Sequence, residues 1–217
     1  MKTKIPQATA QRLPLYFYYL SSLNAINIKK ISSSEISNAL KFDATTVRRD
    51  FSNFGSLGKR GFGYNVPALL AFFSKVLFQN KLNNIIIIGV GNLGQALMKH
   101  NFKGNNNINI IMGFDNNPDK RKLKIKNDKK VQIPIYPIKY LKTKIKENKI
   151  NIAILTVPEK AAQKTTDNLV NYGIKGILNF SPIRISVPKN IHVQNINTTS
   201  TIQSLIYSVE SQKQLKK

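Results

Sequence analysis

The segment from Asn83 to His100 constrains the fold more than any other part of the sequence. It reads NNIIIIGVGNLGQALMKH, in which four isoleucines precede a glycine-rich stretch. A continuous β-branched run predicts a strand buried on both faces, as in a parallel sheet. The spacing G-x-G-x-x-G between such a strand and a helix predicts a turn whose backbone N–H groups bind the pyrophosphate of a dinucleotide. The expected cofactor-binding residues of this turn are Gly89, Val90, Gly91, Asn92, Leu93 and Gly94.

The next predicted strand ends in a carboxylate. The segment INIIMGFD ends at Asp115. In dinucleotide-binding folds, an acid about 20 residues beyond the last glycine binds the adenosine ribose. Because a carboxylate repels a 2′-phosphate, Asp115 favours NAD(H) over NADP(H), whereas the nearby Lys120 and Arg121 favour the opposite choice.

Strands and helices then alternate to the end of the chain. INIAILTVP, at 150–158, and IKGILNFSP, at 174–182, are expected strands, and KAAQKTTDNLVNYG is the helix between them. This alternation predicts an α/β fold with a doubly wound parallel sheet, which binds ligands at the carboxyl ends of its strands. The residues expected near the nicotinamide are Thr156, Val157, Pro158, Asn179, Phe180, Ser181 and Pro182.

The first third of the sequence has a different pattern. Helices are expected over 8–23, from a capping box at Ser32 and Glu35, and from an N-cap at Asp43 to a stop at Gly55. The stretch GSLGKRGFGYNVP follows, with glycines around Lys59 and Arg60. Three helices followed by a glycine-rich hairpin are the order of a winged helix.

The third helix has two contrasting faces. Val47, Phe51 and Phe54 share one face, whereas arginine and small polar residues share the other. Arginine contacts guanines or phosphates, and short polar side chains allow close approach to the major groove. The expected DNA-binding residues are Thr45, Thr46, Arg48, Arg49 and Ser52 of the helix and Lys59 and Arg60 of the wing.

The net charge of +24, from 34 Lys and Arg against 10 Asp and Glu, has two explanations. One is a polyanionic partner such as nucleic acid; the other is compositional drift, since Lys, Asn and Ile are all abundant. The absence of cysteine excludes disulfides and thiolate metal sites, and we expect no metal. We also expect no membrane segment and no secretory signal, and therefore a cytoplasmic protein.

No catalytic residue is expected. His100 and His192 stand apart from any motif with a carboxylate or a substrate-binding cation, and no acids lie at catalytic spacing. If the first third of the chain binds DNA, the remaining residues are too few to form a substrate domain beside the cofactor-binding domain. The cofactor is therefore expected to be bound without turnover, although an NAD-dependent oxidoreductase and a DNA-binding protein with a purely structural dinucleotide remain alternatives.

Several segments together resemble the Rex family of redox-sensing transcriptional repressors. They are IPQATAQRLPLY, TTVRRDFSNFGSLGKRGFGYNV, IIGVGNLGQAL, AILTVP and KGILNFSP. The resemblance implies a winged helix over 1–80, a Rossmann domain over 81–198 and a C-terminal helix over 199–217 that is exchanged in a homodimer. It also implies binding to a palindromic double-stranded operator when NADH is scarce, and release when NADH binds in competition with NAD+.

Three departures from the family pattern concern the response to NADH. His100 replaces a usual tyrosine, VQNIN replaces HHID so that Asn197 stands at an acidic position, and DKKVQ replaces a GG before IPIY. In the family, that acid and Arg12 are thought to communicate the cofactor state between subunits. Arg12, His100 and Asn197 are therefore the expected switch residues, and we expect DNA binding to persist with a weaker or altered NADH response.

Overall fold

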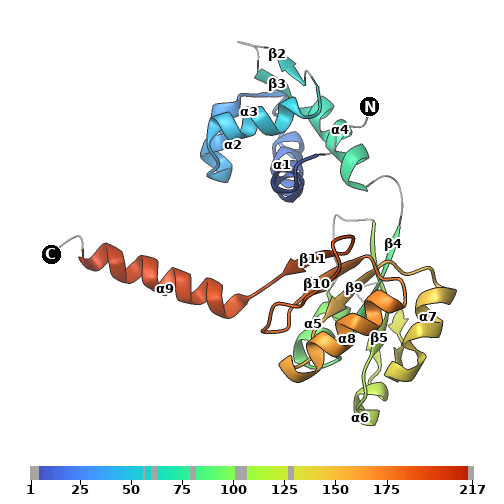
Figure 1. Cartoon of the computed structure of the whole chain (residues 1–217). Coiled ribbons are helices and arrows are strands. Elements are labelled where there is room, and N and C mark those ends of the chain that lie inside the picture. The colour runs from blue at the N-terminus through green and yellow to red at the C-terminus, as the bar shows by residue number, and fades with distance from the viewer. Residues whose placement is uncertain are drawn as a thin grey trace. The chain divides into compact units, whose positions relative to one another are not determined.

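The computed structural model describes residues 5–55, 57–59, 63–78, 82–100, 107–126 and 130–214. The chain divides into two compact units, Met1–Lys81 and Leu82–Lys217 (Figure 1). Among the described residues, the first unit has one hydrophobic core and the second has two, so the two units are described separately.

Within its described residues, the first unit consists of four helices and three short strands. They are α1 (Gln7–Ala25), β1 (Lys30–Ile31), α2 (Ser33–Leu40), α3 (Ala44–Ser52), β2 (Gly58–Lys59), β3 (Gly63–Asn65) and α4 (Val66–Phe78). The strands form an antiparallel sheet in the order β1-β3-β2. Because the β2–β3 hairpin directly follows α3, the unit has the predicted winged-helix architecture.

Local signals fix the helices of this unit as the sequence predicted. Ser32 and Glu35 form a reciprocal capping box at the start of α2, and Asp43 caps α3. Gly55, at φ +92°, lies just beyond the end of α3. Tyr16 and Phe51 meet edge to face at 5.1 Å between ring centroids within the core. Directional aromatic packing of this kind adds to the stability given by buried area.

The second unit contains a six-stranded parallel sheet. Its elements are β4 (Asn83–Ile88), α5 (Asn92–Lys99), β5 (Ile108–Phe114), α6 (Pro118–Arg121), β6 (Ile125–Lys126), β7 (Gln132–Ile133), β8 (Ile135–Tyr136), η1 (Ile138–Tyr140), α7 (Leu141–Glu147), β9 (Ile152–Leu155), α8 (Glu159–Asn171), β10 (Gly176–Asn179), β11 (His192–Asn195) and α9 (Thr198–Gln214). The strand order is β11-β10-β9-β4-β5-β8, and β6 and β7 form a separate antiparallel pair. The order changes direction between β4 and β9, which defines the switch point where such sheets bind ligands.

The four isoleucines of β4 divide between two cores. Ile86 and Ile88 pack in the core that includes residues of α7 and α8, whereas Ile85 and Ile87 pack in the core that includes residues of α5, β6 and β7. All four are at most 8% exposed. Burial on both faces explains why this strand is apolar without alternation, and it confirms the doubly wound sheet.

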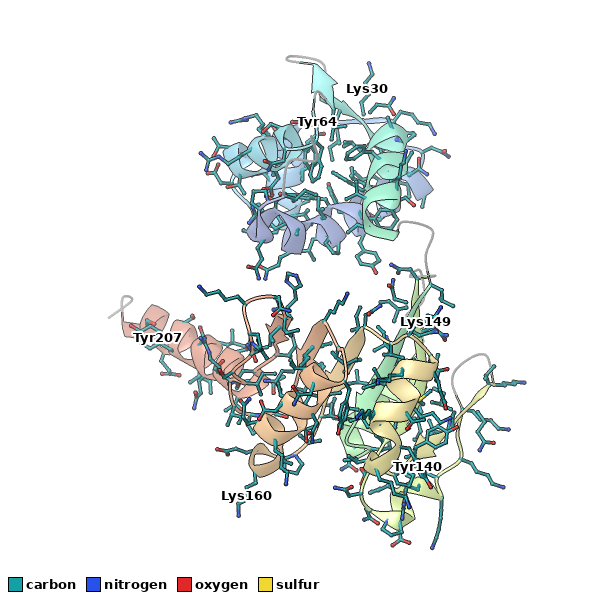
Figure 2. The ribbon with its side chains drawn as sticks, turned by 45° about the vertical axis from the view of Figure 1, so that its right-hand side comes forward. Lys30, Tyr64, Tyr140, Lys149, Lys160 and Tyr207 are labelled. Carbon is teal, nitrogen blue, oxygen red and sulfur yellow. The ribbon has the colours of Figure 1, made fainter. Side chains whose placement is uncertain are left out.

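The last helix, α9, carries large apolar side chains that are not buried. Ile202, Leu205, Ile206 and Val209 are 47% to 64% exposed, and Tyr207, labelled in Figure 2, is 76% exposed. Within the described part of the chain, no helix combines the length and apolar character needed to cross a membrane.

Candidate cofactor site and nucleic-acid interface

The three glycines after β4 serve three different purposes. Gly89 has φ +94°, and a Cβ there would lie 2.7 Å from the carbonyl oxygen of Thr156. A Cβ on Gly94 would lie 2.1 Å from the carbonyl oxygen of Gly89, so this glycine allows α5 to pack against the turn. A Cβ on Gly91 would meet nothing within 4 Å among the described residues. Gly91 therefore borders open space, as expected where a pyrophosphate must approach the backbone.

Hydrogen bonds from neighbouring strands hold this turn. The Thr156 hydroxyl, after β9, donates to the carbonyl of Gly89 at 2.6 Å. The Val90 N–H donates to the Asp115 carboxylate at 2.7 Å, which ties the turn to the end of β5. Within the described ranges, no side chain caps the N-terminus of α5, which begins after Gly91. Its first N–H groups are thus suited to an anion such as a phosphate.

Asp115 lies where an acid can bind a ribose. It is partly exposed, and its second carboxylate oxygen accepts a hydrogen bond of 2.8 Å from the Asn117 N–H. These two backbone donors orient the carboxylate beside the glycine turn. The residues of the turn and Asp115 therefore fit the adenosine and pyrophosphate portions of a dinucleotide.

The turns after β9 and β10 are held together by buried side chains. The Ser181 hydroxyl donates to the Val157 carbonyl at 2.8 Å. The amide of Asn179, 1% exposed, donates to the Asn195 side-chain oxygen and to the Ile183 carbonyl, each at 2.8 Å. Asn179 and Ser181 thus shape the carboxyl edge of the sheet through internal bonds. Among the residues predicted for the nicotinamide end, those with exposed surface are Thr156, Pro158, Phe180 and Pro182.

On α3, the predicted DNA-binding side chains lie on the exposed face. Thr45, Arg48, Arg49 and Ser52 are exposed and Thr46 is partly exposed, whereas Val47 and Phe51 are buried. Arg48 donates to the Ser33 hydroxyl of α2 at 3.3 Å, and the Thr45 hydroxyl bonds to the capping Asp43. The Lys59 backbone belongs to β2, but its side chain and the whole of Arg60 lie outside the described residues.

Asp50 is a functional candidate that the sequence reasoning missed. Its side chain is 1% exposed and accepts hydrogen bonds from Thr9, Arg12 and Tyr16 of α1. Burial alone would raise the pKa of Asp50, but the hydrogen bonds from Arg12, Tyr16 and Thr9 hold that pKa below its usual value. The signal was available in the sequence, because an acid between Val47 and Phe51 interrupts the apolar face of an amphipathic helix.

The three predicted switch residues lie in separate elements. Arg12 belongs to α1, where its side chain is 24% exposed and its partner is Asp50. His100 is the exposed C-terminal cap residue of α5. The side-chain oxygen of Asn197 accepts from the Ser200 N–H at 2.9 Å, so Asn197 caps the start of α9.

A winged helix joined to a dinucleotide-type sheet defines a class of protein, the cofactor-responsive DNA-binding proteins. A family model described as "CoA binding domain" matches residues 80–183, and one described as "Putative DNA-binding protein N-terminus" matches residues 4–52. The redox-sensing transcriptional repressor Rex of Oenococcus oeni is 61% identical over 99% of this chain and 97% of its own. The Rex repressor of Lactiplantibacillus plantarum is 51% identical over 96% and 91%. The chain belongs to the Rex family of redox-sensing transcriptional repressors.

Solved structures agree with this assignment. The Rex-family repressor RSP, in complex with β-NAD+ and operator DNA, superposes with a TM-score of 0.86 at 36% identity, covering 99% of this chain and 96% of its own. RSP in complex with β-NADH gives a TM-score of 0.85 at 35% identity, covering 99% and 98%. The relatives are transcriptional repressors rather than enzymes, which confirms the prediction that the chain is not an oxidoreductase.

Proposed function

We propose that this protein binds a palindromic operator as a homodimer and releases it when NADH replaces NAD+ in the Rossmann unit. The observation that carries the proposal is the presence, in one chain, of an open glycine turn beside Asp115 and an exposed arginine pair on a winged-helix recognition element. RSP, which shares this fold, has been crystallised with NAD+ and operator DNA and with NADH. A repressor acts on the chromosome, so we infer a cytoplasmic location.

Each group of residues contacts a different part of the cofactor or of the DNA. The backbone of Gly89–Gly94 binds the pyrophosphate, Asp115 binds the adenosine ribose, and the turns at Thr156–Pro158 and Asn179–Pro182 border the nicotinamide. Arg48 and Arg49 reach the major groove, while Lys59 and Arg60 of the wing contact the backbone or minor groove. A cofactor changes DNA affinity only through different affinities for two conformations of the protein. Two recognition helices on a dimer must match half-sites one or more helical turns apart, so a changed spacing releases the DNA.

The dimer forms through α9. Four aliphatic residues and Tyr207 are between 47% and 76% exposed on this one helix. A contiguous exposed apolar surface marks an interaction site. A second copy of the chain is the partner that family membership supports, with residues 1–80, 81–198 and 199–217 acting as DNA-binding, cofactor-binding and dimerisation segments.

Asn197 and His100 make the response to NADH in this protein weaker or alter how it is transmitted. A neutral amide at position 197 cannot form the ion pair with Arg12 that an acid would form. Asn197 instead caps α9, and Arg12 already has a carboxylate partner in Asp50. DNA binding is retained, since Arg48 and Arg49 are exposed on α3 and none of the three departures lies in this helix.

One experiment tests the main proposal. An AT-rich palindromic duplex is incubated with the protein without cofactor, with NAD+ and with NADH, and binding is followed by gel shift. We expect a shift without cofactor and with NAD+, and partial release with NADH. The absence of any shift would contradict operator binding, and identical shifts in all three conditions would favour a dinucleotide with a purely structural role.

A second set of variants tests the weakened response. Asn197→Asp restores an acid and preserves the helix cap, since aspartate and asparagine cap equally well. We expect Asn197→Asp, especially together with His100→Tyr, to lower the NADH concentration needed for release. Asn197→Ser is the matched control, because serine also caps but carries no charge. If Asn197→Asp behaves like Asn197→Ser, position 197 does not limit the response.

A further inference from the structure

A single buried carboxylate, that of Asp50, joins α3 to α1. Asp50 accepts hydrogen bonds from the Thr9 hydroxyl at 2.8 Å and the Tyr16 hydroxyl at 2.7 Å. The Arg12 guanidinium donates from Nε at 2.6 Å and from Nη2 at 2.7 Å, one bond to each carboxylate oxygen. Each of these bonds runs from α1 to α3, so the Asp50 carboxylate is held by a neighbouring helix.

The three donors lie on one face of α1. Thr9, Arg12 and Tyr16 are spaced i, i+3 and i+7, which places them in a row along two turns of the helix. The Thr9 hydroxyl also lies 3.5 Å from the side-chain amide of Asn53, the C-cap residue of α3. The row therefore meets α3 at two points, Asp50 and Asn53, one helical turn apart.

The opposite side of α3 carries the side chains to which the proposed function assigns the DNA contacts. Arg48 and Arg49 precede Asp50 directly and are exposed, while Asp50 is buried. A rotation of α3 about its own axis would move both guanidinium groups across the groove. A bidentate contact tolerates only about 0.5 Å and 10–20° of error, so the rotation of α3 must be fixed closely.

Apolar packing alone fixes this rotation poorly. Val47 and Phe51 bury the same side of α3, and the contacts of Val47 are not directional. Phe51 meets Tyr16 edge to face, but aromatic pairs of this kind form at centroid distances from about 4.5 to 7 Å and so tolerate a small rotation. Hydrogen bonds lose strength steeply with misalignment, and a bidentate arginine–carboxylate pair is the most geometrically specific of them. The Asp50 bonds therefore distinguish between rotations of α3 that would bury similar apolar area.

We propose that Asp50 is a positioning residue for DNA recognition, which sets operator selectivity by fixing the rotation of α3 on α1 through Thr9, Arg12 and Tyr16. The inference rests on the proposed operator binding by α3. It goes further in assigning selectivity to a residue that does not touch DNA.

The test compares selectivity rather than affinity alone. The unmodified full-length protein first selects a duplex from random sequence, and binding is then measured to this duplex and to a scrambled duplex of equal composition. Asp50→Asn removes the charge, Thr9→Val removes one donor at nearly constant volume, and Thr9→Ser keeps the hydroxyl. We expect Asp50→Asn to lower the selected-to-scrambled affinity ratio about tenfold or more, the value of one good base contact. Thr9→Val should lower it less, and Thr9→Ser should leave it unchanged.

Loss of stability is controlled separately. Ile36 is 1% exposed in α2 and has no part in the network, so Ile36→Val and Ile36→Ala provide a smaller and a larger destabilisation. All variants are measured at a temperature where circular dichroism shows them folded. An unchanged ratio for Asp50→Asn, or an equal fall for an Ile36 variant of matched stability, would overturn the proposal. Selection of no duplex by the unmodified protein would instead contradict operator binding itself.

Discussion

The glycines of the turn after β4 have different roles: two are required by the folded backbone, and the third is expected to matter for cofactor binding. Gly89 lies at positive φ and Gly94 faces a backbone oxygen at 2.1 Å from its would-be Cβ, whereas Gly91 has open space around it. We expect Gly89→Ala and Gly94→Ala each to cost about 1–3 kcal/mol of unfolding free energy. Gly91→Ala should change stability little, within about 0.5 kcal/mol. It should nevertheless weaken NADH binding, because its methyl group would enter the space proposed for the pyrophosphate.

Thermal unfolding and calorimetric titration with NADH check this expectation. The control is Gly173→Ala, which lies at φ +102° after α8 and away from the turn. It should cost stability without a direct effect on NADH affinity. Normal NADH affinity in Gly91→Ala would show that the phosphates lie elsewhere.

Asp50 gives stability a specific dependence on pH. Its pKa in the folded protein is lower than in the unfolded chain, although burial opposes this, because Arg12, Tyr16 and Thr9 donate to the charged form. The stabilisation is therefore complete above the ordinary aspartate pKa of about 4 and is lost as the pH falls through the lower folded value. In Asp50→Asn this contribution is absent at every pH.

Urea unfolding between about pH 3 and pH 7 measures the difference. We expect the stability advantage of the unmodified protein over Asp50→Asn to shrink as the pH falls below about 4. Hydrogen bonds from Ser32 and Thr45 also lower the pKa values of Glu35 and Asp43, but these groups titrate in both proteins and cancel in the comparison. A constant difference across the range would show that Asp50 is not a charged partner.

At the scale of elements, α9 predicts the assembly state. Leu205 and Ile206 are 64% and 57% exposed in the single chain. If they meet a second subunit, Leu205→Glu places a charge in an apolar interface and should shift the protein toward monomer. Gln203→Glu adds the same charge on the same helix at an exposed polar position and should leave the dimer intact. Light scattering after size exclusion distinguishes the two, and a Leu205→Glu variant that remains dimeric would exclude α9 as the contact.

Local sequence signals predicted most elements, because they act between neighbouring residues. Short-range signals correctly predicted the start of α2, the start of α3 and strand β4: the capping box at Ser32, the cap at Asp43 and the isoleucine run. The Asp50 network was missed because its donors lie 34 to 41 positions away in the sequence. The internal role of Asn179 was missed for the same reason, since its partner Asn195 comes from the next strand. The two-residue edge strand β8 and the β6–β7 pair are too short to show periodicity.

At the scale of the whole molecule, the charge of +24 is spread evenly between the two units. Of the 34 lysines and arginines, 12 belong to the 81 residues of Met1–Lys81 and 22 to the 136 residues of Leu82–Lys217, so the winged-helix unit is not enriched in cations. Charge alone therefore does not identify the DNA-binding surface, and the two explanations of the composition make different predictions. If DNA is bound only through the winged helix, cations elsewhere act at long range and are screened beyond about 8 Å at physiological salt.

The salt dependence of operator binding separates these explanations. Arg48→Gln and Arg49→Gln should each weaken binding, and removing one cation that pairs with a phosphate should reduce the slope of log affinity against log salt by about 1. Lys142→Gln and Lys146→Gln remove the same charge from exposed positions on α7 and serve as matched controls. We expect the α7 variants to keep the slope of the unmodified protein, because the proposed phosphate contacts belong to α3 and the wing. An equal reduction in both pairs would mean that the cofactor-binding unit also binds DNA, and that its lysines are more than a product of composition.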